Sequence, residues 1–210
     1  MPAFLIDAIN DPGKSEASFS FNPATDYAKW VNELFEALTI KNAHLAGHSK
    51  GGWIVLNSLI EIPDRIRKAV LLAPAAGINA KLKTAFLLRS LLVGINPSVK
   101  NVTSYFKYIS GSGKKVNTQY IEYLSKVIKG TRTRPIKHRQ FTNEELKAIR
   151  KPVFLLFGEH EVTVDYKKVI ARAKELISHL ETTIVPDAGH GLQGEHPELV
   201  NRYIIDFLRR

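Results

Sequence analysis

Ser49 and His190 are the two residues of this sequence whose surroundings predict chemistry. Ser49 is the centre of GHSKG (residues 47–51), which matches G-x-S-x-G, and it lies where a predicted short strand ends and a predicted helix begins. A serine on such a turn has a strained backbone and a hydroxyl lifted clear of the sheet, which suits a nucleophile. We expect Gly47 and Gly51 to be required because side chains there would collide with the neighbouring strand and helix.

A serine hydroxyl reacts only after a neighbouring base removes its proton. His190 fits that base because it lies in a glycine-bracketed loop, PDAGHG, that follows a predicted strand. A carboxylate must then orient the histidine. Glu161 follows the predicted strand 153–157, where the acid of such a set is expected, and Asp165 competes with it. Glu161 is favoured because Asp165, just before a predicted helix, suits an N-cap.

The other six histidines predict no metal site. His48 lies within the serine turn and is expected to pack or hydrogen-bond nearby, and no H-E-x-x-H or similar ligand pattern occurs. Gly13-Lys14-Ser15 resembles the end of a phosphate loop, but Ala8 stands where the earlier glycine would be needed, so no nucleotide site and no cofactor are predicted. Five histidines are expected to be surface or structural: His44, His138, His160, His179 and His196.

Strands and helices alternate in the first and last parts of the chain, which predicts an α/β fold with a mostly parallel sheet and crossover helices. The apolar run Ala3–Ile9 predicts a buried strand. Further strands are expected at 43–47, 68–73, 153–157 and 182–185, with helices at about 25–38, 50–60, 165–177 and from Pro197 onward.

The middle of the chain differs from both ends. From Ile78 to Thr142 helical periodicity continues without strand signals, and the segment holds 13 Lys and Arg against one acid, Glu122. This predicts a helical, basic insertion at 78–142 between a first core part, 1–77, and a second, 143–210. Phe86, Leu87, Leu91 and Leu92 are expected either to line an apolar pocket or, as the more common alternative, to pack in a core.

The basic insertion predicts attraction to anions, with an acidic lipid surface as one candidate and an ordinary solvated surface as the alternative. Its densest clusters are Lys114-Lys115, Arg132-Thr133-Arg134 and Lys137-His138-Arg139. No specific nucleic-acid binding is expected, and the sequence predicts no oligomeric state. Without cysteines, an apolar run of membrane-spanning length or a basic N-terminal leader, the chain is expected to be cytoplasmic.

The chain resembles the α/β-hydrolase superfamily, and more closely bacterial carboxylesterase-like members, over nearly its whole length. The resemblance rests on IDAINDPGKSE, TDYAKWVNELFEAL, AHLAGHSKGGW, PDRIRKAVLLAPAAG, LKAIRKPVFLLFGEHE and IVPDAGHGLQGEHPELV. It implies that residues 78–142 form a lid and that a carboxylic ester or related acyl bond is hydrolysed through an acyl-serine. It also implies that Glu161 stands at the position of the acid. C–C hydrolases and acyltransferases share this triad.

The sequence differs from the family pattern at the oxyanion hole. The chain opens at what looks like the family's fourth strand, and the His-Gly loop that follows the third strand has no counterpart. The backbone N–H of Lys50 is therefore the one oxyanion donor expected, which predicts weak activity or none. Either Ala3–Ile9 pairs with 43–47, or an apolar sheet edge stays open. A non-catalytic binding protein, or a gene remnant on a hydrolase scaffold, is the alternative.

Overall fold

A four-stranded parallel sheet forms the centre of the computed structural model, which describes residues 3–9, 23–78, 81–111, 117–131 and 138–210. Neighbouring strands follow one another in chain order, β1-β2-β3-β4. Every residue of β3 is buried, as expected for an apolar strand covered on both faces. The strands are β1 (Ala43–His48), β2 (Ile66–Leu72), β3 (Val153–Gly158) and β4 (Leu180–Val185).

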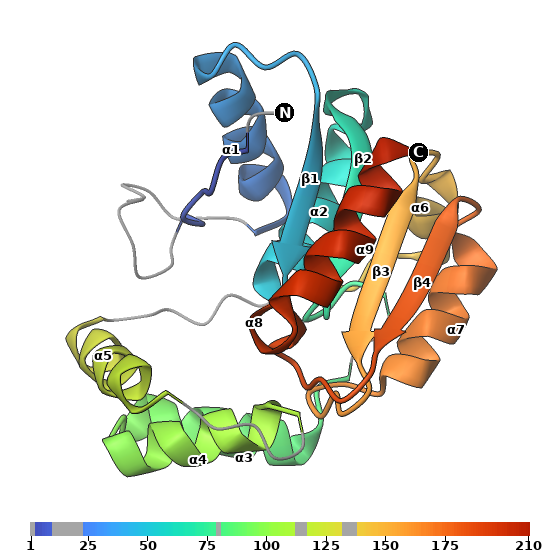
Figure 1. Ribbon diagram of the computed structural model, residues 1–210. Helices are drawn as coiled ribbons and strands as arrows, with labels where there is room; N and C mark the ends of the chain where they lie inside the picture. The colour runs from blue at the N-terminus through green and yellow to red at the C-terminus, as the bar shows by residue number, and fades with distance from the viewer. Residues whose placement is uncertain (1–2, 10–22, 79–80, 112–116, 132–137) are drawn as a thin grey trace.

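Helices cover both faces of this sheet. In Figure 1, α9 crosses one face and α2 lies on the opposite one. Trp53 and Leu56 of α2 are fully buried, and Phe207 of α9 packs on Phe154 of β3 with ring centroids 5.1 Å apart. The helices of the core are α1 (Pro23–Ala37), α2 (Lys50–Glu61), the 3-10 turn η1 (Pro63–Arg65), α6 (Asn143–Ala148), α7 (Tyr166–Leu176), α8 (Leu192–Glu195) and α9 (Pro197–Arg209). The predicted α/β class with a parallel sheet is confirmed.

Three helices between β2 and α6 form the insertion: α3 (Thr84–Ile95), α4 (Val99–Ile109) and α5 (Thr118–Gly130). They lie beyond the carboxyl ends of the strands (Figure 1) and share a small core of their own around Val93, Val102 and Ile121. On α3, the side chains of Leu87, Leu91 and Leu92 are 47–59% exposed, so the expectation that they pack in a core is wrong. Pocket lining by these residues remains a prediction.

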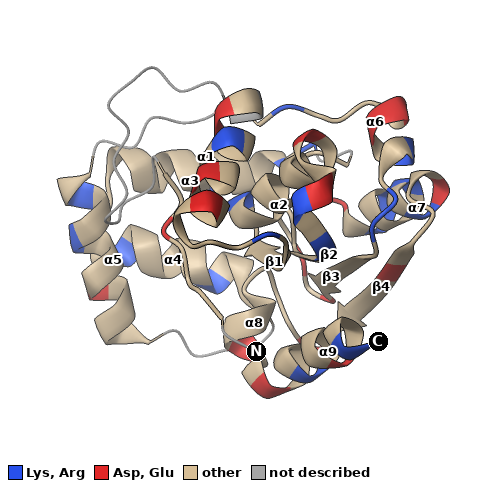
Figure 2. Cartoon of the chain, turned by 90° about the horizontal axis from the view of Figure 1, so that it is seen from above, with Lys and Arg blue, Asp and Glu red and all other residues tan. Residues whose placement is uncertain are grey.

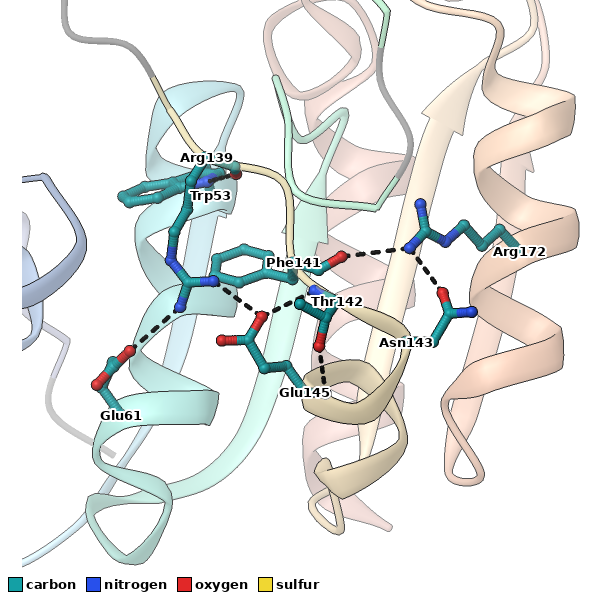
Figure 3. A network of polar contacts seen from close by, with 8 residues as sticks. All are labelled: Trp53, Glu61, Arg139, Phe141, Thr142, Asn143, Glu145 and Arg172. Atoms are coloured by element: carbon teal, nitrogen blue, oxygen red, sulfur yellow. Dashed lines mark hydrogen bonds and ion pairs between the residues drawn. The ribbon is translucent and has the colours of Figure 1, made fainter.

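The chain returns from the insertion to the core through a polar network (Figure 3). Trp53 donates its indole N–H to the carbonyl of Arg139 at 2.9 Å, and the Arg139 guanidinium pairs with Glu145 at 2.8 Å and Glu61 at 3.3 Å. Arg172 donates to the carbonyl of Phe141, which is buried and stacked on Trp53. The exit of the insertion is therefore tied to α2, α6 and α7.

The predicted strand at Ala3–Ile9 is wrong. Residues 3–9 form no strand, and Leu5 is fully exposed, while Ile9 is buried and accepts a hydrogen bond from the Tyr27 hydroxyl of α1 at 3.2 Å. An apolar run becomes a strand only where another strand offers hydrogen bonds, and this segment is held by a helix instead. Among the described residues β1 pairs with β2 alone, and no described strand lies on its other edge.

Lys and Arg are distributed along the helices of the insertion (Figure 2). The clusters Lys114-Lys115 and Arg132-Thr133-Arg134, together with Lys137, lie outside the described residues. Arg139, from the third cluster, is engaged by Glu61 and Glu145. The anionic-surface interpretation stays a prediction. None of the helices in the described part of the chain is long and apolar enough to cross a membrane.

Candidate active site

Ser49 lies at the turn between β1 and α2, and its backbone is strained. Its φ of 52° and ψ of −113° place a residue with a Cβ in a region that few non-glycine residues adopt. Ser49 N–H donates to the carbonyl of Leu72 at 2.9 Å, which ties the turn to β2. The hydroxyl does not cap α2, although Ser49 occupies the N-cap position. Backbone strain of this kind persists only where contacts with the surrounding structure hold it in place, and it is concentrated at functional sites.

Of the two glycines expected to be required around Ser49, the structure confirms Gly47 and contradicts Gly51. A Cβ on Gly47 would lie 2.2 Å from the carbonyl oxygen of Gly51, so Gly47 admits no side chain. A Cβ on Gly51 would meet nothing within 4 Å, so the expected collision at that position is wrong. Gly52 is the crowded one, because its Cβ would come within 3.0 Å of Pro74. The helix turns Gly52, not Gly51, toward the loop after β2.

Glu161 and His190 meet at the carboxyl ends of β3 and β4. His190 Nδ1 lies 2.7 Å from Glu161 Oε2, and both residues are buried, with 6% and 4% of their surfaces exposed. The parallel register of the two strands brings together residues 29 positions apart in the chain. Asp165, the competing carboxylate, accepts a hydrogen bond from the N–H of Lys168 and caps α7.

The Glu161 carboxylate is stabilised in its charged form. Burial opposes its ionisation, but the hydrogen bond and charge of His190, together with donors on Thr163, outweigh burial and hold the pKa of Glu161 below its usual value. Thr163 N–H donates to Glu161 Oε1 at 2.5 Å, and Thr163 Oγ1 lies 3.5 Å from His190 Nδ1. Glu161 is therefore ionised at neutral pH and can orient an imidazole and stabilise its positive charge.

His48 joins the serine turn to the histidine loop. Its Nε2 lies 2.8 Å from the carbonyl oxygen of His190, and the two rings are 4.8 Å apart. This agrees with the expectation that His48 packs or hydrogen-bonds nearby. Burial and the neighbouring charge of His190 lower the pKa of His48 to about 4. A neutral His48 with its proton on Nε2 can donate to the carbonyl of His190.

The depressed pKa of His48 predicts acid sensitivity. The unfolded chain protonates this histidine near its ordinary pKa of 6.5, whereas the folded chain resists down to about 4. The contribution of His48 to the free energy of unfolding is therefore fully present above pH 6.5 and is lost as the pH falls toward 4. Between pH 7 and pH 5 we expect this group to lower the free energy of unfolding by about 2 kcal/mol, measured by urea titration. In His48→Asn the free energy of unfolding should fall by about 2 kcal/mol less between pH 7 and pH 5 than in the wild type. His179→Asn, at an exposed position, should show the same decrease as the wild type.

Lys50 is the first residue of α2, directly after Ser49, and its ammonium lies 5.4 Å from the centre of the Tyr27 ring. The N-terminus of a helix favours negative charge, which suits the proposed role of the Lys50 N–H toward an oxyanion. No group of His, Cys, Asp and Glu arranged to hold a metal ion occurs among the residues that the structure describes.

Sequence reasoning missed two residues that hold this site. Thr163 contacts both Glu161 and His190, and Glu195 accepts hydrogen bonds from the backbone N–H groups of Gly189 and Gly111. The sequence carries no specific signal for either, because an E-x-T spacing and a glutamate near a helix end are both common. Their partners become evident only from the fold.

The family model for serine aminopeptidase, S33, matches residues 17–197. Carboxylesterase YbfK of Bacillus subtilis is 31% identical over 98% of this chain and 70% of its own length. The chain belongs to the serine aminopeptidase S33 family. A second relative, the uncharacterized carboxylesterase nap of B. subtilis, is 28% identical to this α/β-hydrolase over 97% of this chain and 69% of its own length.

Solved structures agree with this membership. The crystal structure of carboxylesterase CesB (YbfK) from B. subtilis superposes with a TM-score of 0.87 at 30% identity, covering 96% of this S33-family chain and 72% of the other. Naproxen esterase (carboxylesterase NP) from the same organism gives a TM-score of 0.85 at 28% identity, covering 95% and 71%. The chain thus has the α/β-hydrolase fold of these hydrolases.

Proposed function

We propose that this chain is a serine esterase in which Ser49 is the nucleophile, His190 the base and Glu161 the acid of the triad. The observation that carries the proposal is the buried 2.7 Å pair of His190 Nδ1 and Glu161 Oε2, next to the strained serine turn. With Nδ1 engaged by the carboxylate, His190 has its second nitrogen, Nε2, for the serine proton. The similarity to CesB, named a carboxylesterase, supports an ester as the substrate class.

In the acylation step, Ser49 Oγ attacks the ester carbonyl carbon while its proton passes to His190 Nε2. The carbonyl oxygen becomes an oxyanion that the N–H of Lys50 stabilises. The tetrahedral intermediate then collapses, the carbon–oxygen bond to the alcohol breaks, and the imidazolium returns its proton to the departing alkoxide. The alcohol leaves and the acyl group stays on Ser49.

Deacylation repeats these steps with water. His190 Nε2 removes a proton from water, the hydroxide attacks the acyl-serine, and the carboxylic acid leaves as Ser49 regains its proton. Lys50 is the one oxyanion donor that we assign within the described residues. Removal of one such donor lowers turnover by on the order of a hundredfold to a thousandfold, so this N–H has a large part in the proposed mechanism.

We further propose that the helical insertion, residues 78–142, acts as a lid over this site. The N–H of His190 donates to the carbonyl of Ile109, the last residue of α4, at 2.7 Å. The insertion therefore contacts the backbone of the proposed base itself. A segment in that place is suited to limit which acyl groups reach Ser49.

A fluorophosphonate probe tests the proposal, because it reacts with a serine whose proton a base removes. The purified chain should gain the mass of one probe, and peptide mapping should place the label on Ser49. p-Nitrophenyl esters of increasing acyl length would then define the substrate. If the folded chain shows neither a label nor ester turnover, the esterase proposal is wrong and the non-catalytic binding protein takes its place.

A further inference from the structure

Glu195 lies five residues after the proposed base, at the end of the short helix α8, and its carboxylate bridges two parts of the chain. Glu195 Oε2 accepts a hydrogen bond from the N–H of Gly189 at 3.0 Å and another from the N–H of Gly111 at 2.7 Å. Gly189 directly precedes His190, and Gly111 follows α4 of the insertion. One charged oxygen thus joins the histidine loop to the insertion.

The two backbones that Glu195 joins are in direct contact. A Cβ on Gly189 would lie 2.3 Å from the carbonyl oxygen of Ile109, and one on Gly111 would lie 2.5 Å from the carbonyl oxygen of Asp187. Glycine at both positions lets the chains approach this closely. The approach leaves the N–H groups of Gly189 and Gly111 away from water, so they need an acceptor within the protein.

A carboxylate is a better acceptor for these two groups than a neutral side chain. Hydrogen bonds to an ionised acceptor are roughly twice as strong as neutral ones. On the other side of the same loop, His48 lies 2.8 Å from the carbonyl oxygen of His190 and Glu161 engages Nδ1. Glu195 fixes the N–H of Gly189, directly before the His190 N–H that donates to the carbonyl of Ile109 at 2.7 Å. Through Gly111 it adds a side-chain link between this loop and the insertion to that backbone contact.

We propose that Glu195 is a positioning residue for His190, which sets the imidazole relative to Ser49 by holding the Gly189 peptide against the insertion. This inference rests on the proposed esterase function. Glu195 itself touches no reacting atom. Because a displacement of about 1 Å in a catalytic group can lower turnover by about a hundredfold, loosening this peptide should act on the chemical step and leave substrate binding largely intact.

The test compares Glu195→Ala, Glu195→Gln and the matched control Glu198→Ala in the full chain. Glu198 is exposed in the first turn of α9, three residues away, and its replacement removes the same charge. With a p-nitrophenyl ester, Glu195→Ala should lower kcat by about tenfold to a hundredfold while KM changes less than about twofold. Glu195→Gln, which keeps an acceptor oxygen, should lose less, and Glu198→Ala should match the wild type. Each rate is divided by the fraction of folded protein, which thermal unfolding measures.

Hydrogen exchange measured by mass spectrometry provides a readout that is independent of activity. In Glu195→Ala, peptides containing Gly111 and Gly189 should exchange faster together, and Glu198→Ala should leave both unchanged. Equal kcat in Glu195→Ala and Glu198→Ala would overturn the positioning role while leaving the esterase proposal standing. If the wild-type chain shows neither labelling by the fluorophosphonate probe nor turnover, the esterase proposal fails. Unchanged exchange at both peptides in Glu195→Ala would overturn the bridge by Glu195. If Glu195→Ala does not fold, the same comparison is made with Glu195→Gln.

Discussion

Replacing Ser49 by alanine is expected to lower kcat/KM for a short p-nitrophenyl ester by at least about a thousandfold. The Ser49 hydroxyl oxygen is the atom that the proposed mechanism bonds to the acyl group, and removal of a catalytic serine typically abolishes all but the catalysis that binding and oxyanion donors supply. Initial rates at several substrate concentrations measure the effect. The variant should also fail to take up the fluorophosphonate probe.

Ser178→Ala is the matched control for this experiment. Ser178 is exposed in the connection between α7 and β4, far along the chain from the turn, and its hydroxyl has no part in the proposed mechanism. This variant should keep wild-type rates and wild-type labelling. If Ser49→Ala retained more than about a tenth of the wild-type rate, Ser49 would not be the nucleophile, and hydrolysis would have to arise elsewhere in the chain.

Replacing Glu161 by glutamine is expected to lower kcat by on the order of a thousandfold to ten-thousandfold. The carboxylate holds the proton of His190 on Nδ1 and stabilises the imidazolium that forms during acylation, whereas an amide can present its own N–H to Nδ1 and select the wrong tautomer. Glu161 Oε2 lies 2.7 Å from Nδ1 in a buried site, so solvent does not replace the lost charge readily. Steady-state kinetics measure kcat.

Glu175→Gln removes the same charge from an exposed position on α7 and should leave kcat unchanged. Glu161→Asp, which keeps the charge on a shorter side chain, should lie between the wild type and Glu161→Gln. A Glu161→Gln enzyme with nearly full kcat would show that another group orients His190. Asp165, the competing residue in the sequence, would then be examined next, although it caps α7.

The sequence predicted the elements that carry the site with good accuracy, because their signals are local. The strand expected at 43–47 is β1 (Ala43–His48), the helix expected at about 50–60 is α2 (Lys50–Glu61), and the last helix begins at Pro197. Apolar periodicity, a proline in the first turn and the spacing of G-x-S-x-G act within a few residues. The helix α6 was missed, although Thr142 and Glu145 form a capping box that could have indicated it.

Other features were decided by contacts between distant segments. The run at Ala3–Ile9 is as apolar as a buried strand, yet it forms none, because a strand depends on a pairing partner that the local sequence does not specify. The leucines of α3 illustrate the same difficulty, since helical periodicity predicts the helix but not what covers its faces. Likewise, the crowding at Gly52 depends on where Pro74 lies, which the local sequence does not specify.

By itself the sequence determined the candidate residues Ser49, Glu161 and His190, through motifs that place each one after a strand. Only the tertiary structure decided which carboxylate meets the histidine, because the parallel register of β3 and β4 brings Glu161 to Nδ1 and leaves Asp165 at the start of α7. It also decided that Glu195 reaches both the histidine loop and the insertion. The physical reason is the same in each case: the local chain specifies the conformation of an element, and long-range packing specifies its neighbours.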